Sequence, residues 1–367
     1  MKRSPPCLSL SKNPYPRSLS RSAFLLGLAL GPVAAVLLVA AMDLGASASG
    51  WGYAVGAALT AVGLLSMPWR SRRGLTRAGV GLLLLIACLR LLTADGNQLA
   101  TLRLPDESPR LINRLVAERD GTLFAARLLL LSGQLPRSDA RGLLPALDSA
   151  FERMHAAEGP IATPAIATWL GRQSPEDFDA VVISPDGARA PQSAVVLLHG
   201  YAGNFAVYCW QLSRAATAIS ALTVCPSVGP VGDWWAPRGE QTLERTLAWL
   251  ERRGIRRVYL AGLSNGGLGA SVLAARVSHP GIELKGLVLI SGASSRAPTP
   301  RIPTLIVQGR HDSMMPTPRM RAFAERTGPL ATYFEVNSGH FAFLDRYEEC
   351  ERAISQWLVE RERVIHG

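Results

Sequence analysis

Three apolar stretches near the beginning of the chain limit what this part of the protein can fold into. The first two, residues 23–42 and 51–69, are each about as long as a helix needs to be to cross the hydrocarbon core of a bilayer. The third, residues 78–92, is shorter and carries Arg90 near its far end, where a long side chain can reach the membrane interface. We therefore predict a membrane anchor of three transmembrane helices over residues 1–95.

The basic residues around these stretches predict an orientation. Five Lys or Arg and no acidic residue precede the first stretch, four arginines fill the second connection, and the first connection carries only Asp43. Since basic residues accumulate on the cytoplasmic side, we expect a cytoplasmic N-terminus and a periplasmic or extracytoplasmic position for everything after the third helix, in a bacterial inner membrane. A signal peptide cleaved near residues 46–48 is an alternative for the first stretch, but it leaves the other two unexplained.

The net charge of +11 does not indicate a nucleic-acid-binding protein. Residues 1–95 hold ten Lys or Arg and two Asp, which gives +8 and leaves about +3 for the rest of the chain. The sequence contains no zinc-finger, Walker or dinucleotide-binding pattern. We expect no nucleic-acid partner, no metal and no cofactor.

A second constraint comes from residues 262–266, Gly-Leu-Ser-Asn-Gly, which follow the apolar run 258–261. They indicate a strand that ends in a sharp turn and presents the hydroxyl of Ser264 above a sheet. Glycines two positions before and after the serine are what such a nucleophile elbow requires, because side chains there would collide with the neighbouring strand and helix. The pattern is short enough to occur by chance, so other parts of the chain have to support it.

Three further motifs follow buried strand patterns, as this serine would require. A glycine-rich turn at 199–204 breaks the first of these patterns, as expected where backbone N–H groups point into an oxyanion hole. Asp312 follows the apolar run 304–309, and His340 follows the run 332–336. The sequence thus places a serine, a carboxylate and a histidine after three separate strands.

These residue types fit nucleophilic catalysis. A serine hydroxyl is a poor nucleophile unless a base removes its proton, and a neutral imidazole can do this near neutral pH. His340 is the candidate base for Ser264, and Asp312 is the candidate carboxylate that fixes its tautomer. His311 is an alternative base and Glu335 an alternative acid, but His311 is adjacent to Asp312 and Glu335 lies within a strand rather than after one.

The order of serine, aspartate and histidine resembles that of the α/β-hydrolase superfamily, over about residues 176–367. The resemblance implies an α/β fold with a doubly wound, mostly parallel sheet. It also implies that the backbone N–H groups of Tyr201 and Asn265 form the oxyanion hole. The nucleophile motif is similar to that of the prolyl oligopeptidase group of serine peptidases as well, but no stretch offers the repeated short strands of their β-propeller domain.

The loops around the predicted sheet bear on the substrate. Many lipases and epoxide hydrolases of this fold insert a helical cap between the sixth and seventh strands, but only about a dozen residues join Ser291 to the strand at Thr304. We expect the site to be open from that side. Trp234 and Trp235 follow the fourth strand and are expected to wall the substrate pocket, with a simple packing role as the alternative.

Two features outside the motifs concern the rest of the chain. Residues 96–175 have helical apolar spacing, clearest at 123–131 and 142–155, and predict a helical connector that packs on the core or shades the site. Cys209 and Cys225 are expected at a helix start and at the end of the adjacent strand, which is within reach of a disulfide. Two buried thiols are the alternative.

The sequence therefore predicts a membrane-anchored serine hydrolase that cleaves a small or lipid-like carboxylic ester through an acyl-serine intermediate. A peptidase, a thioesterase and an acyltransferase use the same intermediate and stay open as alternatives. A non-catalytic membrane receptor or scaffold would have no need for all three of Ser264, Asp312 and His340.

Overall fold

The computed structural model describes residues 17–67, 73–187 and 190–363. The chain forms two compact units, Met1–Leu89 and Arg90–Gly367. Several residues that carry the predictions of membrane span and orientation lie outside the described parts of the chain: Lys2, Arg3, Lys12, Trp69, Arg70 and Arg72.

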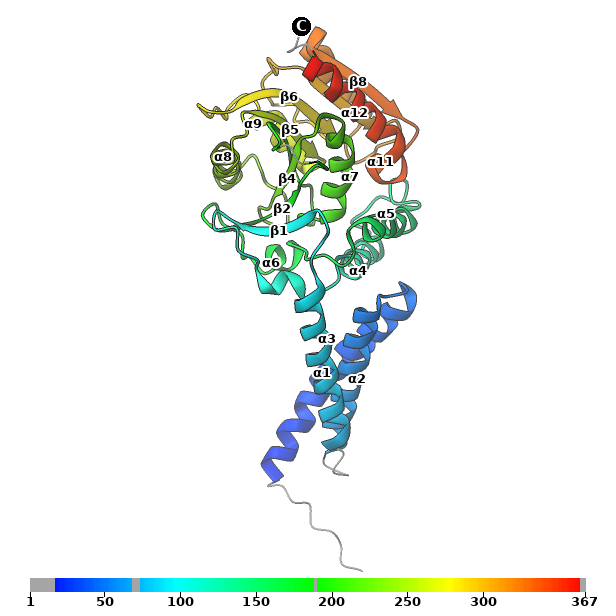
Figure 1. Ribbon diagram of the computed structural model, residues 1–367. Helices are drawn as coiled ribbons and strands as arrows, with labels where there is room; N and C mark the ends of the chain where they lie inside the picture. Colours follow the sequence, from blue (N-terminus) through cyan, green and yellow to red (C-terminus); the bar gives the residue numbers. More distant parts are fainter. Residues whose placement is uncertain (1–16, 68–72, 188–189, 364–367) are drawn as a thin grey trace, which may run out of the picture. The chain divides into compact units, whose positions relative to one another are not determined.

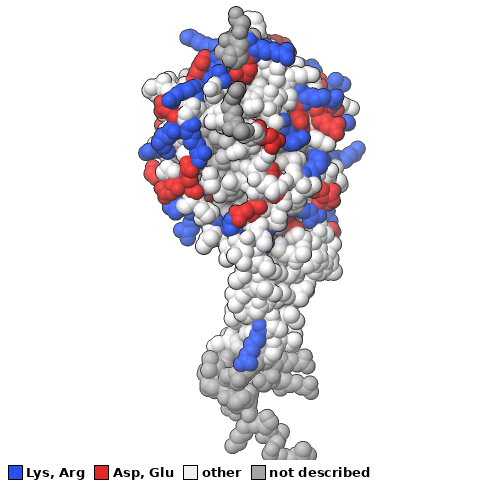
Figure 2. Space-filling model, viewed as in Figure 1, with Lys and Arg blue, Asp and Glu red and all other residues white. Residues whose placement is uncertain are grey.

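The first unit consists of three long helices, α1 (Arg17–Asp43), α2 (Ala48–Ser66) and most of α3 (Arg73–Thr93) (Figure 1). All three are long and apolar enough to cross a membrane, judged by length and composition. On the face shown in Figure 2 the described part of this unit is almost entirely uncharged, whereas basic and acidic side chains are interspersed over the second unit. The three predicted segments are therefore helices of membrane-spanning length.

Helix α3 continues into the second unit, which begins at Arg90. The Arg90 guanidinium is only 8 % exposed and donates to the backbone carbonyls of Arg114 (3.1 Å), Val116 (3.1 Å) and Ile161 (2.9 Å). A buried cation is costly unless its donors are used, and three carbonyl acceptors use them here. The arginine at the end of the third apolar segment therefore binds backbone of the second unit.

The second unit is built on a sheet of eight strands in the order β1-β2-β4-β3-β5-β6-β7-β8. Strand β2 is antiparallel to both neighbours, and the pairs from β4 through β3 to β8 are all parallel. This topology confirms the predicted doubly wound, mostly parallel α/β fold. The strands are β1 (Leu99–Leu104), β2 (Phe178–Ile183), β3 (Ser193–Leu198), β4 (Leu222–Pro226), β5 (Arg257–Leu263), β6 (Glu283–Ile290), β7 (Thr304–Gly309) and β8 (Ala331–Val336).

Helices cover both faces of this sheet, with α8 and α9 on one side and α7 and α12 on the other (Figure 1). The central strands β3 and β4 are consequently buried along their whole length, which explains why they are continuous apolar runs in the sequence. The helices that follow strands are α7 (Ala206–Ala216), α8 (Pro237–Arg252), α9 (Asn265–Leu273), α10 (Thr317–Thr327), α11 (Ala342–Asp345) and α12 (Tyr347–Arg363).

The segment 96–175 differs from the purely helical connector that its spacing predicts. It begins with strand β1, which pairs with β2 and forms one edge of the sheet. Strand β1 is short, and its burial alternates only over Leu99 and Thr101, so a helical period describes the surrounding sequence better. The rest of the segment is helical as predicted, with η1 (Leu111–Arg114), α4 (Glu118–Leu131), α5 (Leu143–Glu158) and α6 (Ala165–Trp169).

Candidate active site

Ser264 stands on the turn between β5 and α9. Its backbone is in a region that non-glycine residues rarely adopt, with φ 55° and ψ −118°. A Cβ at Gly262 would collide with the carbonyl of Gly266, and one at Gly266 would collide with the carbonyl of Leu198 on strand β3. The two glycines are therefore required by close backbone approach, as the sequence pattern predicts.

The structure brings the three candidate residues into one hydrogen-bonded chain. His340 Nε2 lies 2.9 Å from Ser264 Oγ, and His340 Nδ1 lies 2.9 Å from Asp312 Oδ2. An ionised carboxylate can only accept, so Nδ1 carries the proton and the lone pair of Nε2 faces the serine hydroxyl. Asp312 and His340 are each only 5 % exposed. This arrangement can remove the serine proton as the oxygen attacks an electrophilic carbon.

The Asp312 carboxylate is held by its own loop. Its Oδ1 accepts the backbone N–H groups of Met314 (2.9 Å) and Met315 (2.7 Å), and its Oδ2 accepts a hydrogen bond from Gln308 Nε2 (3.1 Å). These donors leave one Oδ2 lone pair for His340. The orientation of the acid is thus fixed before any substrate binds.

The alternative acid and base lie elsewhere. His311 is exposed, and its Nε2 lies 3.0 Å from Asn337 Oδ1. Glu335 pairs with Arg310 (3.0 Å) and Arg321 (2.7 Å) on the surface of β8. Neither side chain takes part in the chain of hydrogen bonds that contains Ser264, so the geometry favours the first assignment.

His199, just before the glycine-rich turn, supports that turn. It accepts the N–H of Val228 at Nε2 (3.2 Å), and its Nδ1 lies 2.8 Å from the carbonyl of Gly200. Burial lowers its pKa to about 4, which keeps the imidazole neutral at physiological pH. We infer a structural role for His199, because both of its ring nitrogens are already used by the backbone.

The two predicted oxyanion donors lie on the two turns that meet at the serine. Asn265 is the first residue of α9, so its backbone N–H has no partner within the helix. Tyr201 lies on the turn after β3, whose shape depends on left-handed Ala202 (φ 77°) and Gly203 (φ 112°). Tyr201 lines the cavity at Ser264, whereas the side chain of Asn265 donates to the carbonyl of Val231 (2.9 Å).

A mostly apolar cavity of about 110 Å³ opens beside Ser264 and His340. Its far wall is supplied by helices α4 and α5, from the segment that precedes most of the sheet. No helical cap stands between β6 and β7 in the described chain, as predicted, but α4 and α5 cover the site from another side. The wall residues from these helices are Thr122, Ala125, Ala126, Leu129, Leu143 and Leu147.

The predicted role of the two tryptophans is wrong. Trp234 is fully buried in the core, where its indole N–H donates to the carbonyl of His199 (2.9 Å) and its ring packs against Gly269. Trp235 is 41 % exposed, and neither residue lines the cavity. The loop after β4 turns Trp234 under the sheet edge because its apolar ring has a buried place there and its N–H finds an acceptor.

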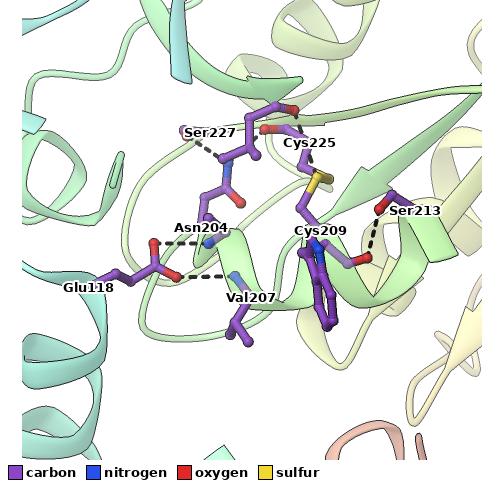
Figure 3. The surroundings of a disulfide bond; sticks show 10 residues. Glu118, Asn204, Val207, Cys209, Ser213, Cys225 and Ser227 are labelled. Atoms are coloured by element: carbon purple, nitrogen blue, oxygen red, sulfur yellow. Dashed lines mark hydrogen bonds between the residues drawn. A yellow bond between two sulfur atoms is a disulfide. The ribbon is translucent and has the colours of Figure 1, made fainter. Parts of the chain in front are cut away.

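Two interactions fix the start of α7, the helix that follows the oxyanion turn (Figure 3). Glu118 of α4 is 2 % exposed and accepts the N–H groups of Ala206 (3.0 Å) and Val207 (3.1 Å). Burial raises the pKa of Glu118 to about 7, although hydrogen bonds from Thr163 and these two amides oppose the shift. The carboxylate thus satisfies the free amides at the beginning of this helix.

Cys209 of α7 and Cys225 of β4 form a disulfide, with their Cα atoms 6.1 Å apart. Nearby, Asn204 Nδ2 donates to the carbonyl of Cys225 (2.6 Å) and to Ser227 Oγ (3.0 Å). Cys350 is a buried free thiol. The oxyanion turn is therefore bounded by a covalent link as well as by the Glu118 contacts.

Sequence reasoning missed Glu118 and also Asp139, a buried residue of the turn between α4 and α5 that accepts the backbone N–H of His340 (2.9 Å). Both are single acidic residues in a segment without a catalytic motif, and no local pattern marks them. Across residues 17–67, 73–187 and 190–363, no three His, Cys, Asp or Glu side chains are grouped so that they could hold a metal ion.

The sheet order and the serine on the turn between β5 and α9 define an α/β-hydrolase fold. Residues 238–342, less than a third of the chain, match the family model described as Serine hydrolase (FSH1). The chain belongs to the alpha/beta serine hydrolase superfamily.

Solved structures with a similar fold come from several bacteria. Est1E from Butyrivibrio proteoclasticus is 15 % identical (51 % of this chain, 95 % of that chain, TM-score 0.43). An alpha-beta serine hydrolase homologue from Coxiella burnetii is 18 % identical (50 % and 92 %, TM-score 0.39). XC6422 from Xanthomonas campestris, described as a member of a/b serine hydrolase without lid, is 18 % identical (49 % and 88 %, TM-score 0.40). No curated protein matches the chain, so its activity has to be inferred from its own site.

Proposed function

We infer that this protein is a membrane-anchored hydrolase that cleaves carboxylic esters through an acyl-serine intermediate. The observation that carries this proposal is the unbroken hydrogen-bond chain from Ser264 Oγ through His340 to Asp312, beside an apolar cavity. In the proposed mechanism Ser264 is the nucleophile, His340 the general base and then the general acid, and Asp312 the group that orients the imidazole.

The proposed reaction has two halves. Ser264 Oγ attacks the ester carbonyl while His340 Nε2 takes the hydroxyl proton, and the N–H groups of Tyr201 and Asn265 stabilise the oxyanion. Collapse of the tetrahedral intermediate breaks the ester C–O bond, and the alcohol leaves with the proton from His340. Water then attacks the acyl-serine with His340 again as the base, which releases the carboxylic acid and restores Ser264.

The shape of the cavity supports an apolar acyl group. Helices α4 and α5 line it with Ala125, Leu129 and Leu147, and these side chains can contact methylenes but offer nothing to a charged or peptide-like chain. A fluorophosphonate probe is expected to label Ser264, and esters of medium-length fatty acids are expected to be better substrates than acetate esters. Labelling at another residue, or turnover of only peptides or thioesters, would contradict the ester assignment.

Filling the cavity should change this preference. Ala125→Phe places a ring in the proposed acyl site, so we expect kcat/KM for an octanoate ester to fall by about 10-fold relative to an acetate ester. The matched control is Ala156→Phe, on an exposed position of α5 away from the cavity. An equal loss for both esters, or the same change in the control, would mean that α4 does not wall the acyl site.

The proposed location of the second unit is extracytoplasmic, in a bacterial inner membrane. The basic residues around the first two apolar segments and the disulfide between Cys209 and Cys225 support it, because disulfides persist in oxidising compartments. Alkaline phosphatase fused after Gly96 should be active, and the same enzyme fused after Arg73 should be inactive. The reverse pattern of activity would place the hydrolase unit in the cytoplasm.

A further inference from the structure

Asp139 is joined to the loops that carry both the candidate base and the candidate acid. It is 5 % exposed, and its Oδ1 accepts the backbone N–H groups of His340 (2.9 Å) and Ser313 (3.1 Å). Its Oδ2 accepts the Ser313 hydroxyl and the Ser138 hydroxyl (3.2 Å). One carboxylate therefore connects the loop after β7, one residue beyond Asp312, with the loop after β8 at His340 itself.

The surrounding backbone is shaped to admit this carboxylate. A Cβ at Gly339 would lie 2.9 Å from Asp139 Oδ1 and 3.2 Å from its Cα, which is tighter than ordinary contact. Only a glycine before His340 lets the two segments come this close without a shift. The approach of Asp139 and the glycine preceding the histidine are thus two parts of one arrangement.

The charge state of Asp139 suits the same arrangement. Burial by itself would raise its pKa, but hydrogen bonds from Ser313, His340 and Ser138 outweigh burial and lower the pKa below its usual value. The group is therefore an ionised acceptor at neutral pH. Hydrogen bonds to a carboxylate are stronger than those to a neutral acceptor, so it holds the two loops firmly.

We propose that Asp139 is a positioning residue, which sets the distance between the two loops so that His340 can contact Ser264 and Asp312 at once. The inference rests on the proposed serine hydrolase function. His340 has to keep both contacts at 2.9 Å, and its own backbone N–H is fixed by Asp139. Asp139 lies outside the residues matched by the family model and comes from the turn between α4 and α5.

The variants Asp139→Ala and Asp139→Asn, in the full-length protein, test this role. Alanine removes every acceptor, so kcat per active serine, counted with a fluorophosphonate probe, should fall by about 100-fold with KM within about twofold. Asparagine keeps one acceptor for the His340 N–H but presents an amide to Ser313. It should therefore recover part of the loss, to about 10-fold below the unaltered protein.

A matched control distinguishes positioning from general stability. Asp148→Asn removes a partly exposed carboxylate of α5 that pairs with Arg119 (2.7 Å), and it should leave kcat unchanged. A role of Asp139 in stability alone would lower the melting temperature and the number of labelled serines but leave kcat per labelled serine unchanged, and that result would overturn the proposal. If Asp139→Ala does not fold, kcat per labelled serine of Asp139→Asn decides in the same way.

The failure of this inference is separable from failure of the proposed function. The unaltered protein is assayed first, with Ser264→Ala as the blank. Absence of ester hydrolysis there would overturn both proposals, whereas full activity of the Asp139 variants would overturn only the positioning role.

Discussion

The Ser264→Ala protein is expected to lose nearly all ester hydrolysis, on the order of 10⁴-fold or more in kcat, while it folds normally. The substitution removes only the hydroxyl that lies 2.9 Å from His340 Nε2, and alanine occupies the same space in the turn. Because the three residues are proposed to act as a unit, His340→Ala should cause a loss of similar size. The measurement is steady-state turnover of an octanoate ester, with circular dichroism to verify the fold.

Ser295→Ala serves as the matched control, since Ser295 is an exposed serine in the loop after β6. It should keep full turnover and full fluorophosphonate labelling, whereas Ser264→Ala should give neither. If a well-folded Ser264→Ala sample still hydrolysed the ester at a substantial rate, the acyl-serine mechanism would be wrong.

Asp312→Asn is expected to lower kcat by roughly 10³- to 10⁴-fold through the tautomer of the histidine. The N–H groups of Met314 and Met315 need an oxygen at the Oδ1 position, so the new amide nitrogen has to face His340. The imidazole would then accept at Nδ1 and carry its proton on Nε2, which can no longer accept the proton of Ser264. The nucleophile itself stays in place, so turnover should fall more than probe labelling.

The control for this variant is Glu335→Gln. Glu335 is held by Arg310 and Arg321 and has no contact with His340, so its amide variant should retain activity within about twofold. Steady-state kinetics of both variants decide the matter. A fully active Asp312→Asn together with an inactive Glu335→Gln would show that the acid has been assigned to the wrong carboxylate.

The meeting of Ser264, Asp312 and His340 could be predicted because the fold has a rule for it. The carboxyl ends of parallel strands lie at one edge of a sheet, and these residues follow β5, β7 and β8. Each strand was visible as a buried apolar run, and the glycines around Ser264 identified the turn. Their assignment to catalysis stays a prediction that the variants above will test.

The wall of the cavity and the supports of the site could not be predicted in this way. Ala125 and Leu147 come from helices whose apolar faces only indicate burial, not against which part of the sheet they pack. Asp139 lies in a polar turn typical of solvent-exposed loops, and nothing local tells that it meets a histidine 201 positions away. Trp234 failed for the opposite reason, since an aromatic residue near a site suits a pocket wall and a packed core equally well.

Glu118 makes the folding of this protein a proton-binding reaction. Its pKa is about 7 in the folded chain and near 4.5 when exposed, so between these pH values the folded form holds a proton that the unfolded form has released. Unfolding then releases that proton, which means that the contribution of Glu118 to stability falls as the pH rises from about 4.5 to about 7 and changes little above that. The full decrease is on the order of 3 kcal/mol. The contact that holds the helix after the oxyanion turn is therefore least costly to keep in a mildly acidic compartment.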